Sequence, residues 1–276
     1  MNKIIINGQK VCEIVNIGSN GPVVGVVGLV HGDETCGRYV LDQLIKDNGV
    51  DGLNLKLIYA NLPAEQQKKR YVEANLNRIF PGDPSGKLEE QIAYALREHL
   101  IGCDFVIDIH ATYDETPAFA ISTIDNAAYE KIAAMTGLEN YVVMTNKLAN
   151  GKALIDFVNQ NGGKGISFEA GKADEPKTSE NAMNTVMNFL NGIKEEAFSK
   201  QDSILVPNKY VAKDVVIAKT EDFVPYFVEP FKLLRAGTTY GRDSQQEYSL
   251  NEDTFPALSV RKPLDKMVFL KTDKIR

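Results

Sequence analysis

Residues 31–34, with the sequence HGDE, place a histidine and a glutamate three positions apart directly after a long apolar run. Imidazole and carboxylate groups are ordinary zinc ligands, and a single turn of backbone lets both reach one ion. A second histidine, His110, ends the segment DFVIDIH, and Glu169 lies in the segment GISFEA. A catalytic zinc site needs three protein ligands, an open position for water and a carboxylate that accepts the proton of that water. The set that matches this need is His31, Glu34 and His110, with Glu169 as the additional carboxylate.

Each of these residues also has a structural interpretation. His31 could be an incidental neighbour of a helix cap, and Glu169 could belong to a structural ion pair. Asp108 lies two positions before His110 and therefore on the same side of a strand. Its carboxylate could orient a ligating imidazole, or it could be a buried polar group that bonds to backbone. Residue type and spacing leave both interpretations of Asp108 open.

The elements that must position these side chains follow from the apolar pattern. Residues 23–30 are too continuously apolar for a half-exposed strand, which predicts a strand buried on both faces of a parallel sheet. A helix should begin near Glu34, with Asp33 as its cap. Further strands are predicted at 53–60, 104–110, 118–122, 141–144 and 165–170, and further helices at 88–100, 126–135, 153–158 and 181–198.

Strands that alternate with helices in this way indicate an α/β fold, with a mixed, mainly parallel sheet between two layers of helices. Ligands bind at the carboxyl ends of the strands in such sheets, because the connecting loops diverge there. The three strands that end near His31, His110 and Glu169 should therefore bring these residues to one edge of the sheet.

Segments outside this alternation define the rest of the chain. Residues 3–17 predict two short edge strands that turn at Asn7 and Gly8. The polar connection 63–87 is long, and its apolar residues predict that it packs against the protein. Beyond Gln201 short strand-like segments alternate with turns. We therefore predict a catalytic domain at residues 1–200 and a small β-rich C-terminal domain at residues 201–276.

Composition limits the class of protein and its partners. The chain has 276 residues, of which 43% are hydrophobic and 25% charged, with a net charge of -6 and a pI near 5.3. Such an acidic chain without a long basic run argues against nucleic acid and anionic membranes as partners. Its three cysteines have no CxxC spacing, and its first apolar run is too short for a signal peptide. These features indicate a cytoplasmic enzyme or binding protein.

Four blocks of sequence resemble a known family in their order and spacing. They are HGDE at 31–34, RYVEANLNRIFPG at 70–82, DIH at 108–110 and FEAG at 168–171. The family is that of succinylglutamate desuccinylase and aspartoacylase, whose members are related to the zinc carboxypeptidases. The β-rich tail also looks like the C-terminal domain of that family. The resemblance implies a zinc carboxypeptidase-like sheet followed by a small β-rich domain.

The resemblance also implies a metal site and a reaction. His31, Glu34 and His110 would hold one zinc ion per chain, and Glu169 would activate the bound water. Arg70 would polarise the scissile amide carbonyl and stabilise the oxyanion, a role that a fixed guanidinium suits in a site shielded from water.

Two further residues are implied to bind substrate. Asn77 and Arg78 would hold the α-carboxylate, and the planar N–H fork of an arginine suits a carboxylate better than a lysine does.

The sequence departs from the aspartoacylase pattern at two positions. Asn159 stands where that subfamily has an arginine for the side-chain carboxylate of the substrate, and Asn75 stands where it has an aspartate. N-acetylaspartate is therefore a doubtful substrate. The basic and tyrosine residues that remain open as replacements are Lys164, Lys172, Arg235, Arg242, Arg261, Tyr240 and Tyr248.

These observations predict a cytoplasmic zinc-dependent amidohydrolase that removes the acyl group from a small anionic N-acyl amino acid. The alternative within the hydrolases is a zinc carboxypeptidase that acts on short peptides or peptide-like conjugates. A ferrous oxygenase and a non-catalytic binding protein are alternatives from other classes. Whether the chain forms a homo-oligomer stays open.

Overall fold

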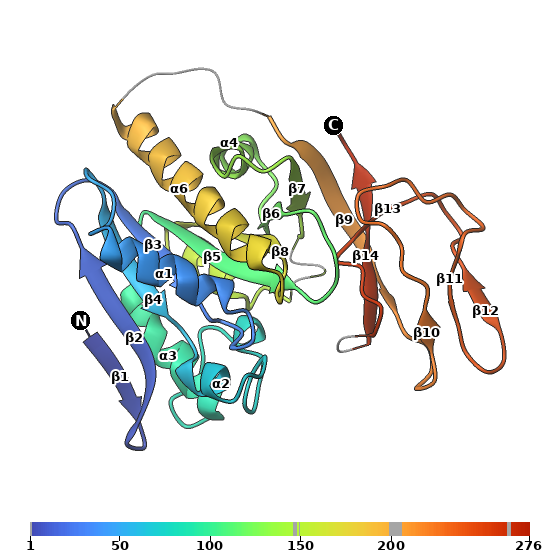
Figure 1. Ribbon diagram of the computed structural model, residues 1–276, viewed down its shortest axis with the longest axis horizontal. Coiled ribbons are helices and arrows are strands. Elements are labelled where there is room, and N and C mark those ends of the chain that lie inside the picture. Colours follow the sequence, from blue (N-terminus) through green and yellow to red (C-terminus); the bar gives the residue numbers. More distant parts are fainter. Residues whose placement is uncertain (1, 146–147, 149, 199–205, 264–265) are drawn as a thin grey trace.

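The computed structural model describes residues 2–145, 148, 150–198, 206–263 and 266–276, and within them a mixed sheet of eleven strands spans the molecule. The strand order is β1-β2-β4-β3-β5-β8-β6-β7-β9-β14-β13 (Figure 1). The strands are β1 (Asn2–Ile6), β2 (Gln9–Ile17), β3 (Val23–Gly28), β4 (Asn54–Tyr59), β5 (Phe105–Thr112), β6 (Phe119–Ser122), β7 (Asn140–Val143), β8 (Lys164–Lys172), β9 (Asn208–Ile217), β13 (Phe255–Ala257) and β14 (Met267–Lys274). The helices are α1 (Cys36–Lys46), α2 (Leu62–Gln66), the 3₁₀ helix η1 (Leu76–Arg78), α3 (Leu88–Leu100), α4 (Ala127–Met135), α5 (Leu154–Gln160) and α6 (Pro176–Phe198).

The centre of the sheet is parallel, as the apolar pattern predicted. β3 pairs in parallel with β4 on one side and with β5 on the other, and β5 pairs in parallel with β8. Val24, Val26 and Val27 of β3 are fully buried. Because both faces of β3 are covered, only a continuous apolar run can occupy it.

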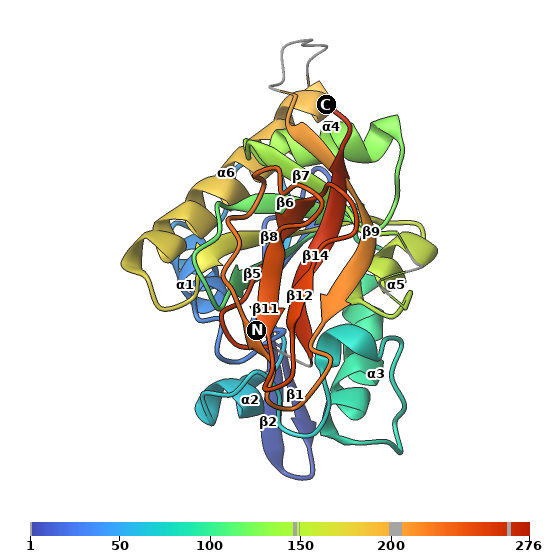
Figure 2. The same cartoon turned by 90° about the vertical axis from the view of Figure 1, so that its right-hand side faces the viewer.

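Helices cover both faces of the sheet, which confirms the predicted α/β class (Figure 2). Val40 of α1 and Phe189 of α6 share one hydrophobic cluster with the strands. On the other face Ile92 and Leu96 of α3 pack in a second cluster with Leu154 of α5. The period of the apolar residues predicted the bounds of α3 correctly.

Two helix starts differ from the prediction. α1 begins at Cys36 after Thr35, and Asp33 does not cap it; Asp33 Oδ2 instead accepts a hydrogen bond from the hydroxyl of Tyr113 at 2.7 Å. Residues between β3 and α1 form a turn in which Glu34 N donates to His31 O at 3.3 Å, so the helix cannot start earlier. α6 begins at Pro176 rather than at 181, because the fixed φ of proline suits a first helical turn.

The edge hairpin and the long connection at 63–87 match the predictions made from the sequence. β1 and β2 are antiparallel and turn at Asn7 and Gly8, which both have positive φ. Leu76 and Phe80 in the connection after α2 are buried against the α3 face of the sheet. This packing holds the connection against the protein.

The C-terminal strands contribute to two sheets. β9 pairs in parallel with β7 and antiparallel with β14, so β9, β14 and β13 extend the large sheet. β10 (Val224–Pro225), β11 (Thr239–Arg242) and β12 (Glu247–Ser249) form a separate antiparallel sheet at one end of the molecule (Figure 1). The predicted domain boundary at 200/201 lies outside the described residues, and the division into two domains stays a prediction. Among the described helices, none has the length and apolarity to cross a membrane.

Candidate metal centre and active site

Three adjacent parallel strands bring the predicted residues together. His31 follows β3, His110 lies in β5 and Glu169 lies in β8, and these strands are neighbours in the order β3-β5-β8. His110 and Glu169 are register partners across the pair of strands. β5 and β8 continue past these residues to Thr112 and Lys172, so both side chains project from the strands and not from the loops that follow.

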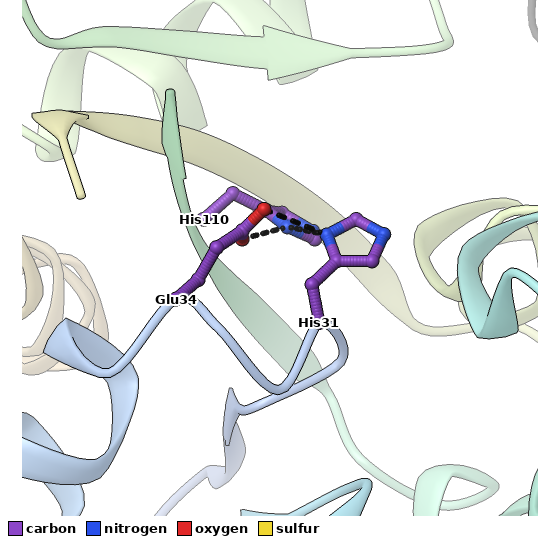
Figure 3. A group of neighbouring side chains, drawn as sticks. All are labelled: His31, Glu34 and His110. Atoms are coloured by element: carbon purple, nitrogen blue, oxygen red, sulfur yellow. Dashed lines mark hydrogen bonds and ion pairs between the residues drawn. The ribbon is translucent and has the colours of Figure 1, made fainter. Parts of the chain in front are cut away.

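His31, Glu34 and His110 form a buried cluster of potential metal ligands. Their ligand atoms all lie within 4.8 Å of one another. The Glu34 carboxylate faces both rings, with Oε1 2.9 Å from Nδ1 of His31 and Oε2 2.9 Å from Nδ1 of His110 (Figure 3). The two Nδ1 atoms are 3.2 Å apart. Two imidazole nitrogens and one carboxylate that converge in this way are a suitable donor set for a divalent metal ion.

The loop after β3, which contains His31 and Glu34, is closely packed and hydrogen-bonded to a neighbouring loop. A Cβ atom at Gly32 would lie only 2.2 Å from the backbone carbon of Ala64, so no larger residue fits at position 32 without a shift of backbone. Gly32 N donates to the backbone oxygen of Arg70 at 3.2 Å. The loop with two of the ligands is therefore tied to the loop that contains Arg70.

The second nitrogen of each imidazole also has a partner. Nε2 of His110 lies 2.8 Å from Oδ2 of Asp108, and Nε2 of His31 lies 3.1 Å from Oδ1 of Asn75. Such partners fix the tautomer and the orientation of a ligating ring. The contact of Asp108 matches the first of its two sequence interpretations. At Asn75 the amide oxygen keeps an acceptor for His31 although the aspartate of the related subfamily is absent.

Electrostatics in the cluster favour a negative Glu34. Burial alone would raise the pKa of the Glu34 carboxyl, but the two imidazoles hold this pKa well below its usual range. Burial lowers the pKa of His31. His110 behaves differently, because the carboxylates of Asp108 and Glu34 outweigh its burial and raise its pKa well above the usual value. A cation between these groups would replace the proton that His110 otherwise holds.

Glu169 differs from the three ligand residues, because one of its carboxylate oxygens has no hydrogen-bond partner among the described residues. Its Oε2 atom is buried and accepts no hydrogen bond from the described residues. Burial raises the pKa of this carboxyl to about 7, with a further upward contribution from Glu34 that His110 and Arg70 oppose. A carboxyl with such a pKa can accept and release a proton near neutral pH.

The residues predicted to contact substrate lie at the same cavity. Nη1 of Arg70 donates to Oε1 of Glu34 at 2.8 Å, whereas Nε of Arg70 is buried without a partner. Nδ2 of Asn77 lies 3.2 Å from Nε2 of His110, and Oδ1 of Asn77 accepts from the backbone N–H of Leu154 at 2.9 Å. Arg78 lines the cavity and donates from Nη1 to the backbone oxygen of Asn77 at 2.8 Å.

A buried glutamate that the sequence analysis did not single out anchors the loop with these residues. Glu89 of α3 is fully buried. Its Oε1 accepts from the backbone N–H of Val72 at 2.6 Å, and its Oε2 accepts from the N–H groups of Glu73 and Ala74 at 3.0 Å each. Nδ2 of Asn61 donates to Oε1 at 3.3 Å. A glutamate in the first turn of a helix is an ordinary surface pattern, so no sequence signal distinguished it.

The cavity beside the cluster has a volume of about 140 Å³. All seven predicted site residues line it, and Tyr113 and Ser259 line it without having been predicted. The seven are His31, Glu34, Arg70, Asn77, Arg78, His110 and Glu169.

The other candidate residues lie elsewhere in the described structure. Asn159 accepts hydrogen bonds from Tyr129 Oη and Gly165 N at 2.6 Å each and does not line the cavity. Neither do the basic residues and tyrosines left open as replacements for its missing charge, which are Lys164, Lys172, Arg235, Arg242, Arg261, Tyr240 and Tyr248.

A family model and a curated protein that match this chain both belong to enzymes that act on N-acyl amino acids. The model of the succinylglutamate desuccinylase/aspartoacylase catalytic domain matches residues 20–194, well over half of the chain. An N-alpha-acetyl-L-2,4-diaminobutyric acid deacetylase of Halomonas elongata is 32% identical over 158 residues. This match covers 52% of the chain and 46% of that protein, so it spans about half of the relative's length.

Solved structures extend the likeness to nearly the whole fold. The product-bound ectoine utilization protein EutE (DoeB) of Ruegeria pomeroyi has a TM-score of 0.77 at 20% identity, covering 95% of this chain and 88% of that one. Murine aminoacylase 3 has a TM-score of 0.75 at 17% identity, covering 94% and 97%. At these identities the likeness shows a shared fold.

Proposed function

This chain belongs to the succinylglutamate desuccinylase/aspartoacylase family, and from that membership we propose that it is a zinc-dependent amidohydrolase of small N-acyl amino acids. The reaction adds water across the amide bond and releases a carboxylate and the free amine of the amino acid. The observation that carries this proposal is the buried His31, Glu34 and His110 cluster beside the unpartnered carboxylate oxygen of Glu169.

The metal would be held by the Nδ1 atoms of the two histidines and the carboxylate of Glu34. Zinc bound there supplies Lewis-acid activation of a water molecule and of the scissile carbonyl. Asp108 and Asn75 keep the two imidazoles in the orientation that the metal requires, because each holds the ring nitrogen that faces away from Glu34.

Glu169 is the proton carrier in this proposal. Its Oε2 takes a proton from the attacking water and returns it to the leaving nitrogen when the C–N bond breaks. Burial raises the pKa of this carboxyl to about 7 in the metal-free protein, and a bound cation beside it would lower the pKa from there, which favours the ionised form that accepts the proton.

The arginines and Asn77 position the substrate. Nε of Arg70 is a buried N–H without a partner, and we assign it to the carbonyl oxygen that becomes an oxyanion. Arg78 and Asn77 hold the α-carboxylate, the guanidinium through paired N–H donors.

The C-terminal strands limit the size of the substrate. Val215 of β9 and Met267 of β14 line the cavity together with Leu258. A wall on that side leaves room for a small N-acyl amino acid and excludes a polypeptide, which argues against the carboxypeptidase alternative.

The free cysteines support a reducing compartment. Cys12, Cys36 and Cys103 are buried and unpaired. We therefore place the enzyme in the cytoplasm, which fractionation of the source cells tests.

A hydrolysis screen with metal analysis tests the proposed reaction. N-acetyl, N-succinyl and N-formyl amino acids, including Nα-acetyl-2,4-diaminobutyrate, are offered beside short peptides. We expect turnover of the acylated amino acids alone, and about one zinc per chain in unsupplemented protein. Turnover of peptides at comparable rates would favour the carboxypeptidase, and iron in place of zinc would favour an oxygenase.

The Glu169→Gln variant tests the role of the base. It should retain zinc and lose about 10²- to 10⁴-fold in kcat, because general base catalysis is removed while the ligands stay. Unchanged turnover would remove Glu169 from the mechanism.

A further inference from the structure

Apolar residues form much of the cavity lining, and this part of the lining is called the apolar wall below. Most of it comes from outside the strands that hold the metal ligands, and Thr123, Ser167 and Ser259 add hydroxyl groups to the lining. β6 and the N-terminal end of α5 contribute to this wall, and so do β9, β14 and the segment that joins β13 to β14. Several of its residues belong to one hydrophobic cluster that β6 and β7 form with the C-terminal strands. The wall residues used below are Ile121, Ile155, Val215, Leu258, Met267 and Leu270.

This apolar wall begins beside the pair of residues that we assign to the α-carboxylate. The backbone N–H of Leu154 donates to Oδ1 of Asn77 at 2.9 Å, and Ile155 is the next residue in α5. A substrate whose carboxylate contacts Asn77 and Arg78 has its amino-acid side chain on the neighbouring carbon. Ile155 therefore lies beside the position assigned to the carboxylate, where a side chain on the neighbouring carbon can reach it.

Buried polar atoms without partners show that this cavity is shaped for a ligand. Oγ of Ser259 on the wall, Oε2 of Glu169 and Nε of Arg70 are all buried and unpartnered among the described residues. Native proteins rarely leave such atoms unsatisfied, except where a ligand or water completes them.

The charges that line the cavity already have roles in the proposed reaction. Among the described residues these are the metal-binding cluster, Glu169, Arg70 and Arg78. On the apolar wall itself, the described lining residues offer neither a cation for an acidic side chain nor an anion for a basic one. A charged group placed against that wall would lose its hydration without an ion pair in return.

We propose that the apolar wall is the side-chain pocket of the enzyme and that it selects N-acyl amino acids with an uncharged, apolar side chain. This inference rests on the proposed function. The whole cavity has a volume of about 140 Å³, and it must also hold the acyl group, the amide and the α-carboxylate of the substrate. Aliphatic side chains such as those of leucine and methionine are therefore the expected ligands.

A panel of N-acetyl amino acids with one acyl group tests the proposal on the unmodified enzyme. The side chains are those of glycine, leucine, methionine, phenylalanine, aspartate and 2,4-diaminobutyrate. We expect kcat/KM for leucine to exceed that for glycine at least about tenfold, because the wall covers its apolar carbons. The values for aspartate and diaminobutyrate should fall at least about 100-fold below that for leucine.

A binding experiment provides a readout that does not depend on turnover. The Glu169→Gln protein should bind N-acetyl-leucine at least about tenfold more tightly than N-acetyl-aspartate in calorimetry. The comparison uses the same carboxylate and the same acyl group, so the difference reports the side-chain pocket alone.

A charge placed on the wall should change the preference. Met267 is partly buried at the start of β14, and an arginine stem can replace its length. Met267→Arg should raise the ratio of kcat/KM for N-acetyl-aspartate over N-acetyl-leucine at least about tenfold. Met267→Gln, the control without a charge, should leave this ratio within about threefold of the unmodified enzyme.

The outcomes separate the pocket from the reaction. A preference for aspartate or diaminobutyrate in both rate and binding overturns the pocket and leaves the deacylase intact. Selective binding of N-acetyl-leucine, with no hydrolysis of any panel member or of any N-acetyl, N-succinyl or N-formyl amino acid in the screen, overturns the reaction and leaves the pocket intact. If no compound of the panel or the screen is bound or hydrolysed, both are overturned. The panel and the calorimetry decide the question even if Met267→Arg fails to fold.

Discussion

Replacement of Glu89 by glutamine should loosen the active-site loop at a point that touches neither metal nor substrate. The carboxylate is fully buried and accepts hydrogen bonds from three consecutive backbone N–H groups and from Asn61. The loop it holds begins with Arg70 and continues to Asn77 and Arg78. Glutamine has the same shape, but its amide NH₂ group must face N–H donors on one side.

The magnitude follows from these contacts. Hydrogen bonds to a charged group contribute about 1.5 to 3 kcal/mol each, and a buried donor left without an acceptor costs about 1 to 3 kcal/mol. Each oxygen of Glu89 accepts two of these hydrogen bonds, so the NH₂ group of glutamine leaves two donors without an acceptor, and we expect Glu89→Gln to cost about 2 to 6 kcal/mol. This is a large part of the about 5 to 15 kcal/mol that stabilises a typical folded protein.

Three measurements examine Glu89→Gln. Denaturant unfolding gives the change in free energy, and hydrogen exchange reports the amides of Val72, Glu73 and Ala74. The kcat/KM value for the best N-acyl amino acid should fall at least about tenfold, because small displacements of positioning groups slow the reaction.

Glu73→Gln is the matched control for this experiment. Glu73 is exposed, and its Oε2 accepts one hydrogen bond from Leu88 N at 2.6 Å. Glu73→Gln should therefore lower the free energy of unfolding by about 1 kcal/mol. The reasoning fails if Glu89→Gln costs less than about 1 kcal/mol and leaves exchange at the three amides unchanged.

Three other predictions concern the metal site. Treatment with a chelator should abolish hydrolysis and lower the melting temperature, and added zinc should restore both, because an ion that binds only the folded state stabilises it. In chelated protein the pKa of Glu169 is about 7 against an ordinary 4.5, so the folded state holds a proton that the unfolded state releases. Stability should therefore decrease by about 3 kcal/mol as pH rises through this window, and less so in Glu169→Gln. Gly32→Ala should cost about 1 to 3 kcal/mol and weaken zinc binding, because its Cβ would meet the backbone of Ala64.

Each of these predictions has a result that contradicts it. Hydrolysis that survives full chelation excludes a metal-dependent reaction. The free energy of unfolding could also show the same pH dependence in the chelated unmodified protein and in the chelated Glu169→Gln variant. That result would mean that the proton released on unfolding belongs to a group other than Glu169. Normal zinc affinity in the Gly32→Ala variant would mean that position 32 tolerates a side chain.

The sequence by itself determined the elements and the chemical groups of this site. A continuous apolar run must be buried on both faces, so residues 23–30 predicted a central parallel strand, and the period of apolar residues predicted the bounds of α3. Parallel strands carry their carboxyl ends to one edge, and so the residue types near those ends predicted a common site for His31, His110 and Glu169. The sequence predicted the start of α1 less accurately, because the turn that positions Glu34 moves this start to Cys36.

Only the tertiary structure decided how this site is supported and which residues line its cavity. The contacts of Asp108, Asn75 and Glu89 join residues whose types are equally common in caps, turns and surface helices, so their roles depend on neighbours that the chain order does not reveal. The apolar wall is the clearest case, because Ile155 and Met267 are far apart in sequence and line one cavity in a fold whose sheet β9 and β14 extend. Side-chain selectivity depends on the shape that these distant segments form together, and local spacing does not encode that shape.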